Sequence, residues 1–294
     1  MKKLIPALCM LLVAACLMGT STYAWFSANK NVTASGMSVK AAAEGGLGIA
    51  SYTNAQVKPV STAFLTNATV DWNNHKGLTG KTISPASFNE GNWYTATATS
   101  VNAYGAATGN YSPVAAASLA DFANVSRWQI KALEDGTTNA LKVKSIQVTN
   151  AAAAGKEEST QLNKALRVAI KVGNLAIGED GKETWTNVDW FYFAPSYNTA
   201  AGVQFTQATT TDGVTTYAPV ANAAVKTGTV TTDDAKNVVT STYTTSDTII
   251  WSALTTAPID VEVYVYYEGE DANCTSANAF AVDTLSVSIE YTIQ

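Results

Sequence analysis

Three short acidic stretches are the parts of this chain whose residue types and spacing come closest to a binding site. They are Glu179-Asp180-Gly181, Asp233-Asp234 and the run from Glu268 to Asn273. Carboxylate oxygens bunched in a loop can hold calcium outside the cell, where a weak site is sufficient. The run with Glu268, Glu270 and Asp271 is the best candidate, although none of the three has EF-hand spacing and solvated turns between strands are the simpler explanation. No other cofactor is expected.

Catalytic motifs are missing from the sequence. The chain has one histidine, His75, and three cysteines, and it contains no HExxH, GxSxG, P-loop or Cys/His cluster. The sequence therefore lacks the residues of a zinc hydrolase, of a serine nucleophile elbow and of a phosphate-binding P-loop. Glycoside hydrolysis needs only two carboxylates and is the catalytic alternative that the sequence leaves open. We expect that the chain is not an enzyme and that His75 is a loop residue.

Composition limits the class of protein and of partner. With 47% hydrophobic, 10% aromatic and 14% charged residues, the 294-residue chain is too apolar for disorder and too weakly charged for a coiled coil. Its net charge is −5, and without Lys2 and Lys3 it is −7, from 16 basic against 23 acidic residues. Nucleic acid is not an expected partner, because phosphate binding needs a basic surface.

The first 24 residues have the pattern of a signal peptide. Lys2 and Lys3 precede an apolar stretch, and Thr22-Tyr23-Ala24 has the small-x-small form of a cleavage site after Ala24. Two alternatives remain: a permanent N-terminal anchor, and a lipobox, Val13-Ala14-Ala15-Cys16, in which Cys16 would be lipidated. Each of these interpretations places the protein outside the cytoplasm, secreted or at the cell surface.

The cysteines agree with export but provide no disulfide. Cys9 and Cys16 lie in the export segment, so cleavage after Ala24 leaves Cys274 alone. The fold must then be held by its apolar core. An exported chain with so few cysteines is more typical of a Gram-positive surface than of a eukaryotic ectodomain.

Apolar and polar residues alternate with period two in several segments, the pattern of half-buried strands. The parity of the apolar residues changes between Val143 and Ile146, which predicts a bulge near Ser145. Tyr264 and Tyr266, on the polar face of one segment, fit either a carbohydrate platform or a second buried face. The predicted strands are 93–101, 128–132, 141–148, 166–172, 188–193, 248–254, 259–267 and 285–293.

Helical signals are few. Ser112-Pro113 followed by Val114–Phe122 predicts a short helix, and residues 151–166 predict a second one. Two short helices among about ten strands indicate an all-β fold, an antiparallel β-sandwich of jelly-roll type with helical insertions. We expect one domain from residue 37 to 294, with a Thr-rich segment at 206–247 that is either a long hairpin with Asp212-Gly213 at its turn or a mobile insertion.

The segment after the cleavage site has the pattern of an extended strand with one apolar face. Phe26, Ala28, Val32 and Ala34 share one parity, whereas Met37 and Val39 take the other after Ser35-Gly36, which predicts a hinge there. Residues 25–36 then form a tail that can complete the open sheet edge of a neighbouring subunit. Such a contact is head-to-tail and can repeat into a filament. The alternative is that the tail folds back as an edge strand of its own sandwich.

The residues on both sides of the cleavage site resemble those of a known family. Thr22-Tyr23-Ala24-Trp25-Phe26-Ser27, followed by Val32-Thr33-Ala34-Ser35-Gly36-Met37-Ser38-Val39, is similar to the start of the mature chain in the TasA/camelysin family of secreted biofilm-matrix proteins. The acidic turn EGEDANC and the final alternating strand also resemble this family. The resemblance covers about 60 residues at the two ends of the chain, and Cys16 departs from the family pattern.

The resemblance implies a jelly-roll domain, export through a dedicated signal peptidase and assembly into extracellular fibres by donor-strand exchange. The donor positions would be Trp25, Phe26, Ala28, Val32 and Ala34, with Phe26 and Val32 as anchors. The metalloprotease label that some members carry has no support here, since one histidine cannot build the usual zinc site. The expected partner is the chain itself, with a matrix polysaccharide or a minor fibre protein as further candidates. The alternative function is a surface module, lipid-anchored at Cys16, that binds a glycan or a protein.

Overall fold

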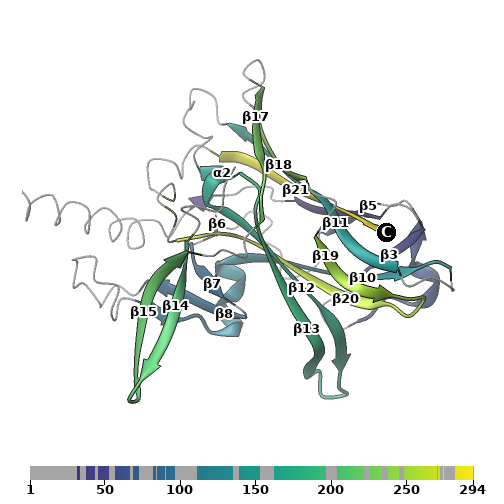
Figure 1. The fold of residues 1–294 in the computed structure, drawn as a ribbon, viewed down its shortest axis with the longest axis horizontal. Helices are drawn as coiled ribbons and strands as arrows, with labels where there is room; N and C mark the ends of the chain where they lie inside the picture. Colours follow the sequence, from purple (N-terminus) through teal and green to yellow (C-terminus); the bar gives the residue numbers. More distant parts are fainter. Residues whose placement is uncertain are drawn as a thin grey trace, which may run out of the picture.

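The computed structural model describes about two thirds of the chain, from Val32 onward. Within that part, two seven-stranded sheets pack face to face as an all-β sandwich (Figure 1). The described residues are 32–33, 38–43, 46–52, 57–66, 69–72, 82–83, 85–89, 91–96, 111–134, 139–152, 162–196, 204–221, 226–233, 238–244, 248–269, 271, 274 and 282–293. None of the helices in these ranges is long and apolar enough to cross a membrane.

The first sheet is antiparallel except at one edge, where β13 and β16 run parallel. Its strands, in spatial order, are β16 (Lys226–Thr227), β13 (Glu183–Ala194), β12 (Leu166–Ile177), β20 (Ile259–Tyr267), β10 (Ala123–Ala132), β3 (Leu47–Ser51) and β4 (Leu65–Thr66).

The second sheet contains the first and the last strand of the sandwich. The first strand of the sandwich, β2, lies parallel to the last one, β21, with Ser38 opposite Ser286 and Ala43 opposite Tyr291. Its strands, in spatial order, are β17 (Thr229–Asp233), β18 (Val238–Thr244), β11 (Asn139–Ala152), β21 (Val282–Ile293), β2 (Ser38–Ala43) and β5 (Thr69–Trp72), and β19 (Ile249–Leu254) pairs with β11 beyond the end of β18.

The core between the sheets follows the predicted alternation. On β21, Leu285, Val287, Ile289 and Tyr291 are fully buried, and the serines between them are only partly buried. From the other sheet, Trp128 meets Tyr291 edge-on, with 6.1 Å between ring centroids. The predicted bulge is also confirmed, because the register between β11 and β21 shifts between Val143 and Ser145.

The second face of β20 is buried as well. A small sheet of β7 (Ser87–Asn89), β8 (Asn92–Ala96) and β9 (Tyr111–Pro113), together with the 3₁₀ helix η2 (Ala116–Asp121), packs on this outer face. Phe88 stacks on Trp93 at 4.2 Å and on Tyr264 at 5.7 Å. Tyr264 and Tyr266 are therefore part of a second buried face, one of the two interpretations of the alternation. The other interpretation, an exposed carbohydrate platform, is wrong.

The helix predicted after Ser112-Pro113 is confirmed only in part, as a 3₁₀ helix that starts at Ala116. Ser112 and Pro113 belong to β9, and the backbone N–H of Val114 donates to the Trp93 carbonyl at 2.8 Å, which keeps the chain tied to β8. Only Ala116–Asp121 then turns, as a 3₁₀ helix closed by the Phe122 N–H on the Leu119 carbonyl. Of the second predicted helix, α2 (Leu162–Ala165) is helical, while residues 151–152 end β11 and residues 153–161 are outside the described ranges.

The Thr-rich segment contains the predicted hairpin. Strands β14 (Gln204–Thr211) and β15 (Val214–Ala221) pair with each other and project from the sandwich (Figure 1). The turn residues Asp212 and Gly213 both have positive φ, 52° and 78°, as a type I′ turn requires. The later part of the segment, β16 to β18, belongs to the sandwich sheets themselves.

Candidate functional site

Along one side of the sandwich, β13 of the first sheet faces β18 and β19 of the second sheet. We call this boundary between the two sheets the seam, and the chain itself closes it at one end. The chain crosses here from β16 in the first sheet to β17 in the second through Gly228. A Cβ at Gly228 would collide with the carbonyl oxygens of Pro195 and Thr242, so the backbone lies directly against both sheets. Phe193 and Tyr243 also meet across the seam, with ring centroids 4.8 Å apart.

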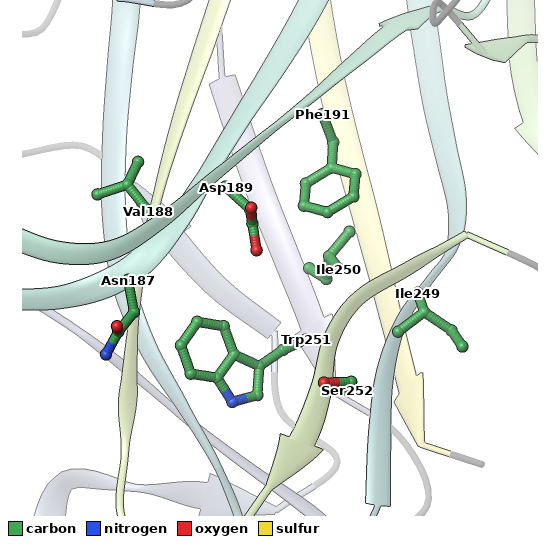
Figure 2. A pocket seen from close by; sticks show the side chains of 8 residues that line it. All are labelled: Asn187, Val188, Asp189, Phe191, Ile249, Ile250, Trp251 and Ser252. Carbon is green, nitrogen blue, oxygen red and sulfur yellow. The ribbon is translucent and has the colours of Figure 1, made fainter.

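At the other end the seam is open and forms a groove of about 510 Å³ between β13 and β19. Figure 2 shows Asp189, Phe191, Ile250 and Trp251 lying between the ribbons of the two strands. The lining consists of Asn187, Val188, Asp189, Phe191, Ile249, Ile250, Trp251 and Ser252. Half-buried apolar side chains thus meet solvent here without a covering strand in the described part of the chain.

Both walls of this groove are strand edges. In the ranges that the structure describes, β13 pairs with β12 on one side and, on the other, only Phe193 and Ala194 pair with β16. Strand β19 pairs with β11 in an irregular register and has no partner on its outer side among those residues. A β-bulge bends β13 at the groove, since Asn187 has a φ of 53° and the register shifts opposite Gly173. Unpaired edges of this kind can accept another strand.

Asp189 gives the groove a negative charge on its inner wall. Residues 189, 191 and 193 alternate onto the face of β13 that points between the sheets, where Phe193 is fully buried and Phe191 packs against the core. Asp189 is itself exposed, and in the described part of the chain it makes no ion pair. The open end of the seam therefore combines an apolar floor with one carboxylate.

A second feature, a buried ionic network, lies on the outer face of the first sheet. Arg127 on β10 bonds Glu262 on β20 through Nε at 2.7 Å and through Nη2, and it pairs with Glu183 on β13 at 2.9 Å. The Lys171 ammonium lies 3.9 Å from the Trp185 ring centroid. Burial lowers the pKa of Lys171. Burial acts in the same direction on Arg127, but the carboxylates of Glu262 and Glu183 together outweigh it and raise the pKa of Arg127.

Asp260 extends this network along β20. Its Oδ1 accepts from the Tyr52 hydroxyl and from Gln129 Nε2 at 2.7 Å, and its Oδ2 accepts from Leu175 N at 2.7 Å and pairs with Lys58 Nζ at 3.1 Å. Glu262 Oε1 accepts from the Tyr264 hydroxyl. Burial, followed by the bond to Asp260, raises the pKa of Tyr52. Every oxygen of Asp260 and Glu262 is thus hydrogen-bonded, and all but Glu262 Oε1 bond to segments outside β20.

The predicted calcium loop contains a salt bridge instead of an open carboxylate cluster in its described part. Asp271 is buried and accepts from Arg167 Nη2 at 2.6 Å, and Glu268 is buried beside it. Burial lowers the pKa of Arg167, but the charges of Asp271 and Glu268 and the hydrogen bond to Asp271 together outweigh burial and raise that pKa. Glu270 lies outside the described residues, as does His75, and the described residues hold no group of three metal ligands. Calcium binding here stays a prediction.

The structure describes two residues of the predicted donor tail. Val32 and Thr33 form β1 and pair antiparallel with Ile83 and Thr82 of β6 in the same chain, apart from the two sandwich sheets. This pairing lies within one chain, but it is not the edge strand of the sandwich that the fold-back alternative predicts. The other positions singled out in the sequence lie outside the described residues: Cys16, Ala24, Trp25, Phe26, Ala28, Ala34, Ser35 and Gly36.

The alternation in the sequence predicts both strands of the groove but not the groove itself. The segments 188–193 and 248–254 have strand patterns, yet alternation does not say which two edges face each other across a seam. One signal was available: Asp189 has the parity of Phe191 and Phe193, so an acid interrupts an apolar face. Comparisons of this chain with protein-family models, with curated proteins and with solved structures found no match.

Proposed function

We propose that this chain is a secreted structural protein that polymerises into matrix or surface fibres by donor-strand exchange of its N-terminal segment. The observation that carries the proposal is the groove between β13 and β19, whose edges have no partner strand along the groove among the described residues, which gives it the form of an acceptor for an added strand. In this proposal the sandwich is of jelly-roll type and residues 25–36 are the donor tail.

The short pairing of Val32 and Thr33, the described part of the tail, supports this role. Among the residues that the structure describes, two residue pairs join β1 to β6, and an isolated two-stranded ladder of this length contributes little stability in water. The tail can therefore exchange that pairing for a longer one on a neighbour. Its Phe26, Ala28, Val32 and Ala34 would occupy alternate positions on one face of the added strand.

The proposed location and partners follow from the sequence. Residues 1–24 would direct export and be removed after Ala24, leaving a mature chain with a net charge of −7. The main partner is a second copy, and a matrix polysaccharide or a minor fibre protein would be an additional one. The role is not catalytic in this proposal, which agrees with the full engagement of the Asp260 and Glu262 oxygens described above.

Assembly of anchor variants tests the proposal. Phe26→Glu or Val32→Glu in the chain from Trp25 to Gln294 should leave the circular dichroism spectrum and the unfolding midpoint unchanged and abolish sedimentable fibres. Thr209→Glu, at an exposed position of the β14–β15 hairpin, is the matched control and should assemble normally. Normal assembly of both anchor variants would refute a donor role for the tail.

A second function is favoured by the chemistry of the groove lining. Trp251 beside Asn187, Asp189 and Ser252 provides an aromatic face and polar groups, the combination that binds sugars. With lipidation at Cys16, the chain would then be an anchored glycan- or protein-binding module. Incorporation of labelled palmitate that disappears in Cys16→Ser would support this alternative, and its absence would remove the anchor.

A further inference from the structure

The donor tail carries one charge in a central position. Residues 25–34 contain one ionisable side chain, Lys30, and it has the same parity as Phe26, Ala28, Val32 and Ala34. In an extended strand, side chains with the same parity point to one face. The face that would enter an acceptor groove is therefore apolar, with a single cation in its middle.

The groove between β13 and β19 complements this face. Its lining combines Val188, Phe191, Ile250 and Trp251 with one carboxylate, Asp189, on the inner face of β13. We propose that this groove receives residues 25–34 of a second copy of the chain, with the Lys30 ammonium next to the Asp189 carboxylate. This inference rests on the function proposed above and adds the acceptor site and its register to it.

The register of the second sheet explains why the occupant is a second copy. The tail precedes Ser38 in the chain, and Ser38 is paired with Ser286. Strand β19, by contrast, lies beside Leu141 and Lys142, which are paired with Ile293 and Thr292. Those points are about 20 Å apart along β21, at about 3.3 Å per residue. In the order β19-β11-β21-β2 they are also three strands apart, about 14 Å.

Ser38, where the tail joins the sandwich, and β19, one wall of the groove, thus lie at opposite corners of the second sheet. Even a straight path of about 25 Å between them would use about eight residues of the tail, and little would remain to fill the groove. A neighbour placed head-to-tail meets no such cost. Because the two surfaces are different, the contact is head-to-tail and can repeat into a filament.

A charge exchange tests the pairing. Lys30→Glu and Asp189→Lys should each lower fibre yield by about tenfold or more, because each places like charges together. The double variant Lys30→Glu/Asp189→Lys should restore fibres. As the matched control, Lys30→Glu combined with Glu179→Lys, an exposed acid in the nearby β12–β13 turn, should not restore them. Failure of the double variant would overturn the proposed contact.

A disulfide trap gives an independent readout. Lys30→Cys/Asp189→Cys, oxidised after assembly, should give a ladder of covalent multimers on non-reducing gels, whereas Lys30→Cys/Glu179→Cys should not. An internal disulfide in a monomer would overturn the second copy as occupant. If the wild type forms fibres but the Lys30→Cys/Asp189→Cys variant gives no ladder, the groove is not the acceptor, although the proposed function stands. If the wild type forms no fibres, the proposed function itself is refuted. A glycan that binds the groove while Asp189→Lys still forms fibres would assign the groove to the alternative function.

Discussion

At the scale of single residues, the most consequential feature is that charges are buried on the outer face of the first sheet. Arg127 and Glu262 are 6% and 3% exposed, so each depends on the other for the solvation that water would otherwise provide. Removing one partner of such a pair leaves an uncompensated charge. The surface pair Lys144–Glu290, at 3.6 Å and with both side chains partly exposed, has no such dependence.

Arg127→Met should accordingly reduce the free energy of unfolding by about 3–5 kcal/mol, because Glu262 remains buried without its guanidinium. Lys144→Met should change it by less than about 1 kcal/mol. Urea unfolding followed by circular dichroism measures both. The double variant Arg127→Met/Glu262→Met should recover most of the loss, and an Arg127→Met protein as stable as the control would contradict the burial of this network.

Cys274 should be inert in the folded protein. Its side chain is 3% exposed, and burial, followed by the charges of Asp271 and Glu268, raises the pKa of the thiol. Because the thiolate is the reactive form, a thiol reagent such as DTNB should label Cys274 slowly in buffer and at once in urea. Rapid labelling of the native chain would mean that the turn between β20 and β21 opens readily.

At the scale of elements, the sandwich depends on the crossing from β16 to β17, which joins the sheets at the closed end of the seam. Gly228→Ala should destabilise the fold by at least about 2–3 kcal/mol, since its Cβ would overlap two backbone carbonyls that cannot move aside like a side chain. Gly213→Ala, at a hairpin turn with no atom near its Cβ, should cost only about 1 kcal/mol through its positive φ. Thermal unfolding separates the two, and equal costs would argue against the crossing as a fixed junction.

Several strands could be predicted from the sequence, whereas their pairing and the burial of their polar faces could not. Alternation identified β21 and β20 and the bulge at Ser145, because the side chains that enter the core must share one parity. It could not predict that Asp260 and Glu262 on the polar face of β20 would be buried, since that burial depends on partners such as Arg127 from distant segments. The groove was not predictable for the same reason, because it depends on which edges the topology leaves unpaired.

At the scale of the whole molecule, buried tyrosines make the fold sensitive to alkali. Burial raises the pKa of five of them above the ordinary value of 10, with Asp260, Glu262 and Glu268 adding to the effect for some: Tyr52, Tyr264, Tyr266, Tyr267 and Tyr291. The folded state retains protons that the unfolded chain releases near pH 10. The stability from these groups is therefore fully present below pH 10 and is lost as the pH rises above it.

Each of these tyrosines should lower the stability by about 1.4 kcal/mol per pH unit above pH 10. We expect cooperative unfolding in alkali, with tyrosinate absorbance at 295 nm rising together with the loss of the circular dichroism signal. Gradual titration of these phenols near pH 10 in a chain that stays folded would contradict their burial.

The central claim is that the tail of one copy completes the sandwich of the next, and electron microscopy tests it most directly. Negatively stained samples of residues 25–294 and of residues 36–294 would be compared at matched concentration and neutral pH, after circular dichroism has established that both are folded. The account predicts filaments from the longer chain and monodisperse particles from the shorter one. Filaments from both, or particles from both, would contradict it.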